Sequence, residues 1–274
     1  MKLATYIYDN HPLVGQVIEN HVHTTAWSDP MTHLIRRGIT PSRLTNNYPL
    51  DKVQLQAPLR PPKIVAIGRN YADHAAETGS AVPTAPLIFA KFPTSVIGNG
   101  EAITWDATIT QQVDWEGELA VVIGKRARNV TEDEALNHVY GYTIANDVTA
   151  RDLQVRIDTQ WTRGKSLDTF CPLGPWLVTR DEIPDPHNLT IKTTVNGELM
   201  QDGNTRDLIF KIPTLIAYCS RMFTLEPGDL LLTGTPPGVG EGRQPPVYLK
   251  DGDVVSITID GIGELTNPCR VLSA

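Results

Sequence analysis

The segment Asp114-Trp115-Glu116-Gly117-Glu118-Leu119-Ala120-Val121-Val122-Ile123-Gly124 places two carboxylates at the start of an apolar run. The run is too short for a helix and ends at a glycine, so residues 118–124 are predicted to form a buried strand. Alternate residues of a strand share a face, so Glu116 and Glu118 should project together and repel each other. A divalent cation removes that repulsion, and carboxylates favour Mg²⁺, Mn²⁺ or Ca²⁺ over Zn²⁺. The alternative from spacing alone is the solvent face of an edge strand.

A third carboxylate follows farther along the chain. Residues 142–147, Tyr-Thr-Ile-Ala-Asn-Asp, are predicted to form a strand that ends in Asp147, the natural third ligand of such a cation. Between the two strands, Thr131-Glu132-Asp133-Glu134 has the pattern of a capping box. It predicts a helix that begins there and ends at Gly141.

The apolar run 63–68 is predicted to be another buried strand, and Gly68-Arg69-Asn70-Tyr71 follows it as a turn into a short helix. This turn would present a cation, Arg69, and a phenol, Tyr71, at the mouth of a site that suits anionic substrates.

His74 and Glu77 lie three residues apart in that short helix, so they share a face and can form a hydrogen bond. A histidine held by a carboxylate is a candidate general base for activating water. The alternative is an exposed helical pair that contributes little to stability.

Lys165 lies in a polar stretch that also contains Asp168. Such a lysine can polarise a carbonyl or protonate a leaving carbon if burial lowers its pKa, although a solvated lysine is the common case. The loop 234–240, Gly-Thr-Pro-Pro-Gly-Val-Gly, lacks the ending of a phosphate-binding loop. Its backbone N–H groups can still hold a carboxylate.

Composition excludes several classes of protein. The chain has 24 Lys and Arg against 31 Asp and Glu, a formal charge of −7, which is wrong for a general nucleic-acid binder. No apolar run approaches the roughly 20 residues of a membrane span. The three cysteines are widely spaced and odd in number, which indicates a reducing, cytoplasmic location.

Turn signals alternate with Val, Ile, Leu and Thr through the C-terminal third, and residues 212–223 carry apolar side chains at helical spacing. The pattern predicts an α+β protein that is rich in strands and has few helices. A proline-rich connector at residues 56–62 separates a small N-terminal domain, residues 1–59, from a larger catalytic domain, residues 60–274.

Five separated segments, taken in order, resemble the fumarylacetoacetate hydrolase superfamily. They are Gly68 to His74 with Glu77, Asp114 to Gly124, Asn146 to Asp152, Arg163 to Pro175, and Pro227 to Gly240. The longer fumarylacetoacetases have a further metal-binding aspartate before their catalytic histidine, but residues 65–68 contain none. The chain is therefore more similar to the short, acylpyruvase-like members.

The resemblance implies a mixed, strongly curved β-sheet roll with peripheral helices, and a homodimer. It implies that Mg²⁺ or Mn²⁺, with Ca²⁺ as a substitute in a crystal, is held by Glu116, Glu118 and Asp147. It further implies that His74 and Glu77 form a water-activating dyad, that Lys165 faces the substrate, and that the residues near the substrate are Arg69, Tyr71 and Thr235.

A 2-oxo acid with a second carbonyl would chelate such an ion, which would stabilise an enolate. If His74 activates water, the result is hydrolytic C–C cleavage, so our leading hypothesis is a Mg²⁺- or Mn²⁺-dependent hydrolase of acylpyruvate-type β-diketo acids. The alternatives on the same site are a decarboxylase of oxaloacetate-like 2-oxo acids, and a 2-hydroxy-dienoate isomerase or tautomerase of aromatic-compound catabolism. A non-catalytic metal-binding module is the alternative from a different class.

Overall fold

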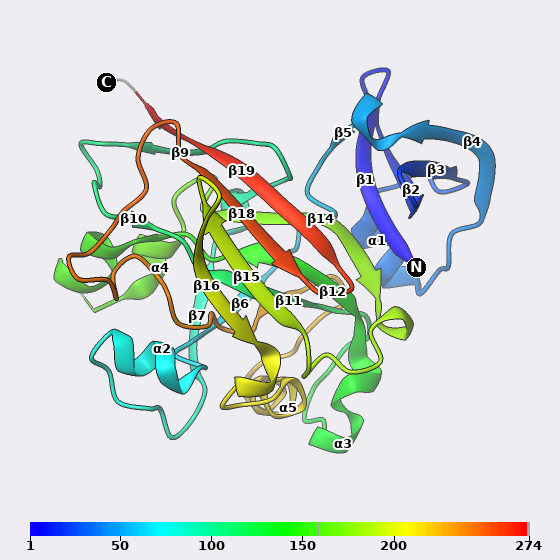
Figure 1. The fold of residues 1–274 in the computed structure, drawn as a ribbon. Coiled ribbons are helices and arrows are strands. Elements are labelled where there is room, and N and C mark those ends of the chain that lie inside the picture. The colour runs from blue at the N-terminus through cyan, green and yellow to red at the C-terminus, as the bar shows by residue number, and fades with distance from the viewer. Residues whose placement is uncertain (158, 273–274) are drawn as a thin grey trace.

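The computed structural model describes residues 1–157 and 159–272. Strands dominate the structure, and the helices are short and lie at the periphery (Figure 1). This confirms the predicted α+β class and the mixed β-sheet roll.

The strands are distributed along the whole chain. They are β1 (Lys2–Tyr8), β2 (His11–Ile18), β3 (His21–Thr25), β4 (Arg43–Pro49), β5 (Gln54–Leu55), β6 (Ile64–Gly68), β7 (Leu87–Lys91), β8 (Val96–Ile97), β9 (Ile103–Asp106), β10 (Val113–Asp114), β11 (Gly117–Ile123), β12 (Val139–Asn146), β13 (Thr149–Ala150), β14 (Cys171–Thr179), β15 (Thr190–Val195), β16 (Glu198–Asn204), β17 (Leu230–Leu232), β18 (Val254–Ile259) and β19 (Gly263–Leu272).

The helices are α1 (Met31–Arg37), α2 (Ala72–Glu77), α3 (Glu132–Ala135), α4 (Trp161–Lys165) and α5 (Ile212–Met222). Single turns of 3₁₀-helix are η1 (Leu50–Lys52), η2 (Pro93–Ser95), η3 (Leu136–His138), η5 (Arg180–Glu182) and η6 (Thr205–Asp207), and η4 (Asp152–Arg156) is a π-helical turn. Among the described residues, no helix has both the length and the hydropathy needed to cross a bilayer.

Two large sheets form the body. A 12-stranded sheet runs in the order β4-β3-β2-β1-β14-β12-β11-β17-β6-β7, with β5 on β1 and β8 on β14. A five-stranded sheet runs β16-β15-β18-β19-β9, and β10 pairs with β13. Most pairs are antiparallel, but β14 with β8, β17 with β6 and β19 with β9 are parallel. The main hydrophobic core contains side chains of both large sheets, such as those of Val121 and Ile257.

The centre of the larger sheet follows the sequence pattern closely. The predicted strands at 63–68, 118–124 and 142–147 are β6, β11 and β12, and every residue of β11 is buried. An apolar run without alternation is typical of a strand covered on both faces. The predicted helices at 72–77 and 212–223 are α2 and α5.

The prediction of a helix from Thr131 to Gly141 was wrong at its C-terminal end. The capping box at Thr131 is present, but the α-helix ends at Ala135, one turn of 3₁₀-helix follows, and β12 begins at Val139. Gly141 belongs to β12, where an added Cβ would lie 2.2 Å from the carbonyl oxygen of Val178. Close pairing with β14 therefore replaces the last predicted turns of helix.

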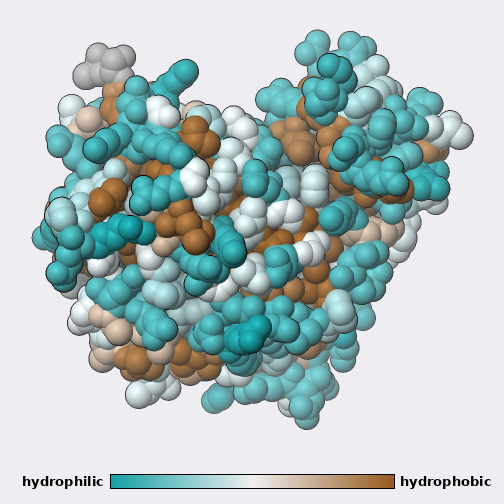
Figure 2. All heavy atoms as spheres, viewed as in Figure 1, coloured by the Kyte–Doolittle hydropathy of each residue, from teal (hydrophilic) through white to brown (hydrophobic). Residues whose placement is uncertain are grey.

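The first strands of the chain form a lobe at the side of the body (Figure 1). They continue the larger sheet through the pairing of β1 with β14. Figure 2 shows a mostly polar surface on the same face, with apolar residues gathered in the recess between the lobe and the body. The domain boundary between residues 59 and 60 stays a prediction.

Candidate active site

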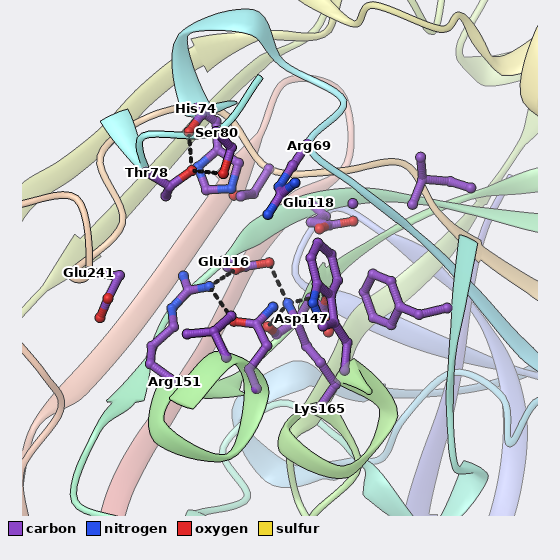
Figure 3. Close-up of a pocket in the computed structure, with 17 residues that line it drawn as sticks. Arg69, His74, Thr78, Ser80, Glu116, Glu118, Asp147, Arg151, Lys165 and Glu241 are labelled. Carbon is purple, nitrogen blue, oxygen red and sulfur yellow. Dashed lines mark hydrogen bonds and ion pairs between the residues drawn. The ribbon is translucent and has the colours of Figure 1, made fainter. Parts of the chain in front are cut away.

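A cavity of about 260 Å³ opens beside the N-terminal end of β11 (Figure 3). Seven of the nine residues predicted for the site line it, which brings together side chains from widely separated parts of the chain. They are Arg69, His74, Glu116, Glu118, Asp147, Lys165 and Thr235.

Strand pairing brings the three predicted metal ligands together. Glu116 directly precedes β11, Glu118 lies in it, and Asp147 directly follows its antiparallel neighbour β12, in which Asn146 is paired with Gly117. One ligand atom from each carboxylate lies within 4.8 Å of the others. All three side chains are buried, and β11 lies between β12 and β17. The alternative of an exposed edge strand is therefore wrong.

The charges of these carboxylates are unequally compensated. Burial raises the pKa of Glu118 well above its ordinary value, and the carboxylates of Asp147 and Glu116 raise it further. Burial also acts to raise the pKa of Glu116, but Lys165 and Arg151 outweigh it and lower that pKa to about 2. Buried oxygen ligands with mutual repulsion fit a hard divalent cation such as Mg²⁺ or Mn²⁺.

Lys165 is the last residue of α4 and is buried, rather than solvated in a loop. Its ammonium lies 2.7 Å from Oε2 of Glu116 and 2.7 Å from Oδ2 of Asp147. Burial acts to lower the pKa of Lys165, but these carboxylates outweigh it and raise the pKa. The shift is opposite to the lowered pKa that was the condition for proton donation by Lys165, and Asp168, its expected neighbour, is exposed.

Two buried cations near the carboxylates were missed from the sequence. The Nζ atom of Lys91 lies 2.7 Å from Oδ1 of Asp147, and Nη1 of Arg151 lies 2.8 Å from Oε1 of Glu116. Arg151 lies within one of the quoted segments, so its place beside the site was recoverable. The signal at Lys91 was the alternation of β7, which puts it on the buried face with Phe89.

His74 and Glu77 form the predicted pair. Nδ1 of His74 lies 2.8 Å from Oε1 of Glu77, and the histidine is 6% exposed and lines the cavity. Oε2 of Glu77 accepts a hydrogen bond from the backbone N–H of Gly238 at 2.8 Å. His74 is therefore buried and Glu77 is half-buried and anchored, and the alternative of an exposed helical pair is wrong.

The loop 234–240 holds carboxylates, as its backbone N–H groups suggested, but they belong to the protein itself. Gly234 donates to Glu118 and Gly238 donates to Glu77. Both glycines have positive φ, 101° and 106°, a conformation that favours glycine and turns the N–H groups toward these acceptors. The loop thus supports one metal-ligand candidate and the histidine partner at once.

The three residues expected near a substrate lie in different surroundings. Arg69 lines the cavity, whereas Tyr71 does not and is buried behind it, where burial raises its pKa. Thr235 lines the cavity, but its hydroxyl donates to the carbonyl of Gly117 at 2.9 Å and accepts from Gln201 at 2.7 Å.

The sequence model described as fumarylacetoacetate (FAA) hydrolase C-terminal matches residues 63–270 of this chain. The chain belongs to this family. Members of the fumarylacetoacetate hydrolase family are also its relatives in structure. A fumarylacetoacetate hydrolase from psychrophilic Exiguobacterium antarcticum superposes with a TM-score of 0.89 and is 42% identical, with 99% of this chain and 100% of that chain covered.

Curated relatives are closer in sequence. The mitochondrial oxaloacetate tautomerase fahd2 of Xenopus laevis is 53% identical over 218 residues, which cover 79% of this chain and 68% of the relative. The oxaloacetate tautomerase YisK of Bacillus subtilis (strain 168) is 50% identical over 224 residues, which cover 80% of this chain and 74% of the relative.

These relatives overturn the leading hypothesis of a C–C hydrolase of acylpyruvates. A tautomerase moves a proton without breaking a carbon–carbon bond. The error has a chemical cause, because enolate stabilisation is common to both reactions and the same residue types serve it. Of the alternative reactions predicted for the same site, tautomerisation is better supported than C–C hydrolysis.

Proposed function

We propose that this member of the fumarylacetoacetate hydrolase family is a divalent-metal-dependent oxaloacetate tautomerase. The reaction interconverts the keto and enol forms of a 2-oxo diacid. Relatives with this name are 50% and 53% identical to the chain. The structural observation that carries the proposal is that His74, oriented by Glu77, lines the same cavity as three clustered carboxylates.

Tautomerisation needs one proton to move between C3 and the oxygen on C2 of the substrate. Nδ1 of His74 is engaged by Glu77, so Nε2 is the ring nitrogen that can take up or return the proton at C3. Glu77 stabilises the imidazolium that forms and is itself held by Gly238. The dyad therefore acts on a carbon-bound proton, and no water has to be activated.

Glu116, Glu118 and Asp147 are the residues proposed to hold Mg²⁺ or Mn²⁺. A bound divalent cation supplies positive charge that stabilises negative charge developing on the C2 oxygen. Lys165 adds a second positive charge, which its contacts with Glu116 and Asp147 keep beside the same carboxylates. Arg69 and Thr235 are proposed to contact the substrate, and Tyr71 to support the turn behind them.

The test follows the ultraviolet absorbance of the enol form of oxaloacetate. Protein stripped of metal should match an albumin blank, and added Mg²⁺ or Mn²⁺ should accelerate enol loss above the same blank with metal. Glu118→Gln should abolish the acceleration, whereas Glu198→Gln at an exposed position should retain it. Metal-loaded protein that only matches the blank would refute the tautomerase, and metal-dependent release of CO₂ would favour the decarboxylase instead.

The protein is further proposed to be a homodimer in a reducing compartment such as the cytoplasm, without nucleic-acid or membrane partners. All three cysteines are buried and free, which supports a reducing compartment. The name of the Xenopus relative places that protein in mitochondria.

A further inference from the structure

Among the described residues, Arg69 is a cavity-lining cation without a carboxylate partner. Lys165 is paired with Glu116 and Asp147, and Arg151 is paired with Glu116 and with Asp114. Within residues 1–157 and 159–272, no carboxylate forms an ion pair with Arg69. Figure 3 shows its side chain directed into the cavity between the segment of His74 and Ser80 and the cluster of carboxylates.

An aromatic ring holds this guanidinium in place. Cζ of Arg69 lies 5.2 Å from the centroid of the ring of Trp161, within the range of a cation–π interaction. Arg69 has a φ of 56°, a left-handed backbone conformation that residues other than glycine seldom adopt. The turn therefore fixes the direction in which the side chain leaves the backbone, and Trp161 supports its charged end.

The position of Trp161 is itself set by its neighbours. An added Cβ at Gly68 would lie 2.3 Å from Cζ3 of Trp161, so the ring occupies space that a side chain at residue 68 would fill. Phe89 meets the ring edge-on, with centroids 5.5 Å apart and planes at 64°. Trp161 begins α4 and Lys165 ends it, so one short helix carries both the ring beside Arg69 and the ammonium beside the carboxylates.

We propose that Trp161 is a positioning residue that holds Arg69 as the receptor for the second carboxylate of the substrate. The site would thus select 2-oxo diacids over 2-oxo monoacids of the same length. The 2-oxo acid end would bind at the three clustered carboxylates together with the cation that they would hold. The distal carboxylate would pair with the guanidinium of Arg69, which can donate two parallel hydrogen bonds to a carboxylate. This inference rests on the proposed function and adds the basis of its substrate selectivity.

Binding of two inert acids tests the proposal without turnover. Malate and 2-hydroxybutanoate have the same carbon chain, but malate has a carboxylate where 2-hydroxybutanoate has a methyl group. Calorimetry on the Mg²⁺-loaded protein should show tighter binding of malate. Trp161→Leu should reduce the ratio of the two affinities by about 2- to 30-fold, the range of a lost cation–π contact, and Trp161→Phe should restore most of it. Arg69→Gln should reduce the ratio further.

Kinetics provide a second readout. Trp161→Leu should raise KM for oxaloacetate by a larger factor than it lowers kcat, because the distal carboxylate does not react. Gly68→Ala should displace the ring of Trp161 while keeping both Trp161 and Arg69. Like Trp161→Leu, it should therefore lower the preference for malate. Near-ultraviolet circular dichroism of each variant identifies folded protein.

The outcomes separate the two proposals. A wild-type protein that does not prefer malate, or a Trp161→Leu variant that loses both acids equally, would overturn the role of Trp161 and Arg69. A malate preference that depends on Trp161 in a protein with no tautomerase activity would support this inference and refute the proposed function.

Discussion

The Nζ atom of Lys91 lies 2.7 Å from Oδ1 of Asp147, and both side chains are buried. The same ammonium donates to the carbonyls of Val148 and Lys165. One lysine of β7 thus ties together the turn after β12 and the end of α4. Because Lys165 takes the other oxygen of Asp147, a cation contacts each oxygen of that carboxylate.

Replacing Lys91 should be strongly destabilising. Lys91→Met leaves Asp147 buried with one cation fewer, and breaking a buried pair from one side costs about 3–5 kcal/mol. Urea unfolding of metal-free protein measures the change. The matched control is Lys52→Met, since Lys52 forms an exposed pair with Asp51 and should lose less than about 1 kcal/mol. Equal losses in the two variants would contradict the structural role of Lys91.

Metal affinity should rise with pH because of Glu118. Burial, Asp147 and Glu116 raise its pKa in the metal-free protein, whereas a cation binds the carboxylate form. Binding of Mn²⁺ should therefore release protons, and the affinity should fall as the pH is lowered through the raised pKa. Calorimetry in two buffers of different ionisation enthalpy counts the protons. If the Glu118→Gln variant releases the same number of protons on binding Mn²⁺, the protons come from another group.

Loss of His74 should affect turnover and spare metal binding. His74→Ala removes the proposed proton carrier, and general acid–base catalysis contributes typically about 10²–10⁴-fold. We expect kcat to fall within that range while the Mn²⁺ affinity changes less than about twofold. His33→Ala, at an exposed position of α1, is the control. A His74→Ala variant with wild-type kcat would exclude His74 as the proton carrier.

His187 should make folding stability depend on pH away from the site. Burial lowers its pKa, Lys211 lowers it further and Asp185 opposes both. Its Nε2 also accepts a hydrogen bond from the N–H of Ile212 at 3.2 Å, which only the unprotonated nitrogen can do.

The sign follows from proton linkage. Between the lowered folded pKa of His187 and the ordinary value of 6.5, the unfolded chain binds more protons than the folded one. Stability should therefore rise as the pH increases through this window, and the contribution of His187 should be lost as the pH falls through its folded pKa and stay constant below it. NMR titration should show the lowered pKa, and His187→Gln should reduce the pH dependence of the unfolding midpoint. A folded pKa at or above 6.5 would contradict the structure.

Local pattern was sufficient for much of the site. Apolar runs bounded by glycine predicted β6 and β11, and the period of a strand placed Glu116 and Glu118 on one face. Helical spacing predicted the pair of His74 and Glu77. These are relationships between residues a few positions apart, so the backbone geometry of a single element determines them.

Only the tertiary structure decided which charges compensate one another. Lys165 pairs with Glu116, 49 residues away, and not with nearby Asp168, because strand pairing sets which distant segments meet. The helix predicted to reach Gly141 was shortened for the same reason, since pairing with β14 outweighed local propensity.

The contrast extends to chemistry. The sequence by itself determined that carboxylates, a histidine paired with a glutamate, and a lysine are present at spacings that suit enolate chemistry. The burial of Glu118, the partners of Lys165 and the contact of the Arg69 guanidinium with Trp161 depend on contacts between distant segments. Those contacts set the dielectric environment and the balance of charge, and these quantities, more than the identity of the residues, determine what such side chains can bind.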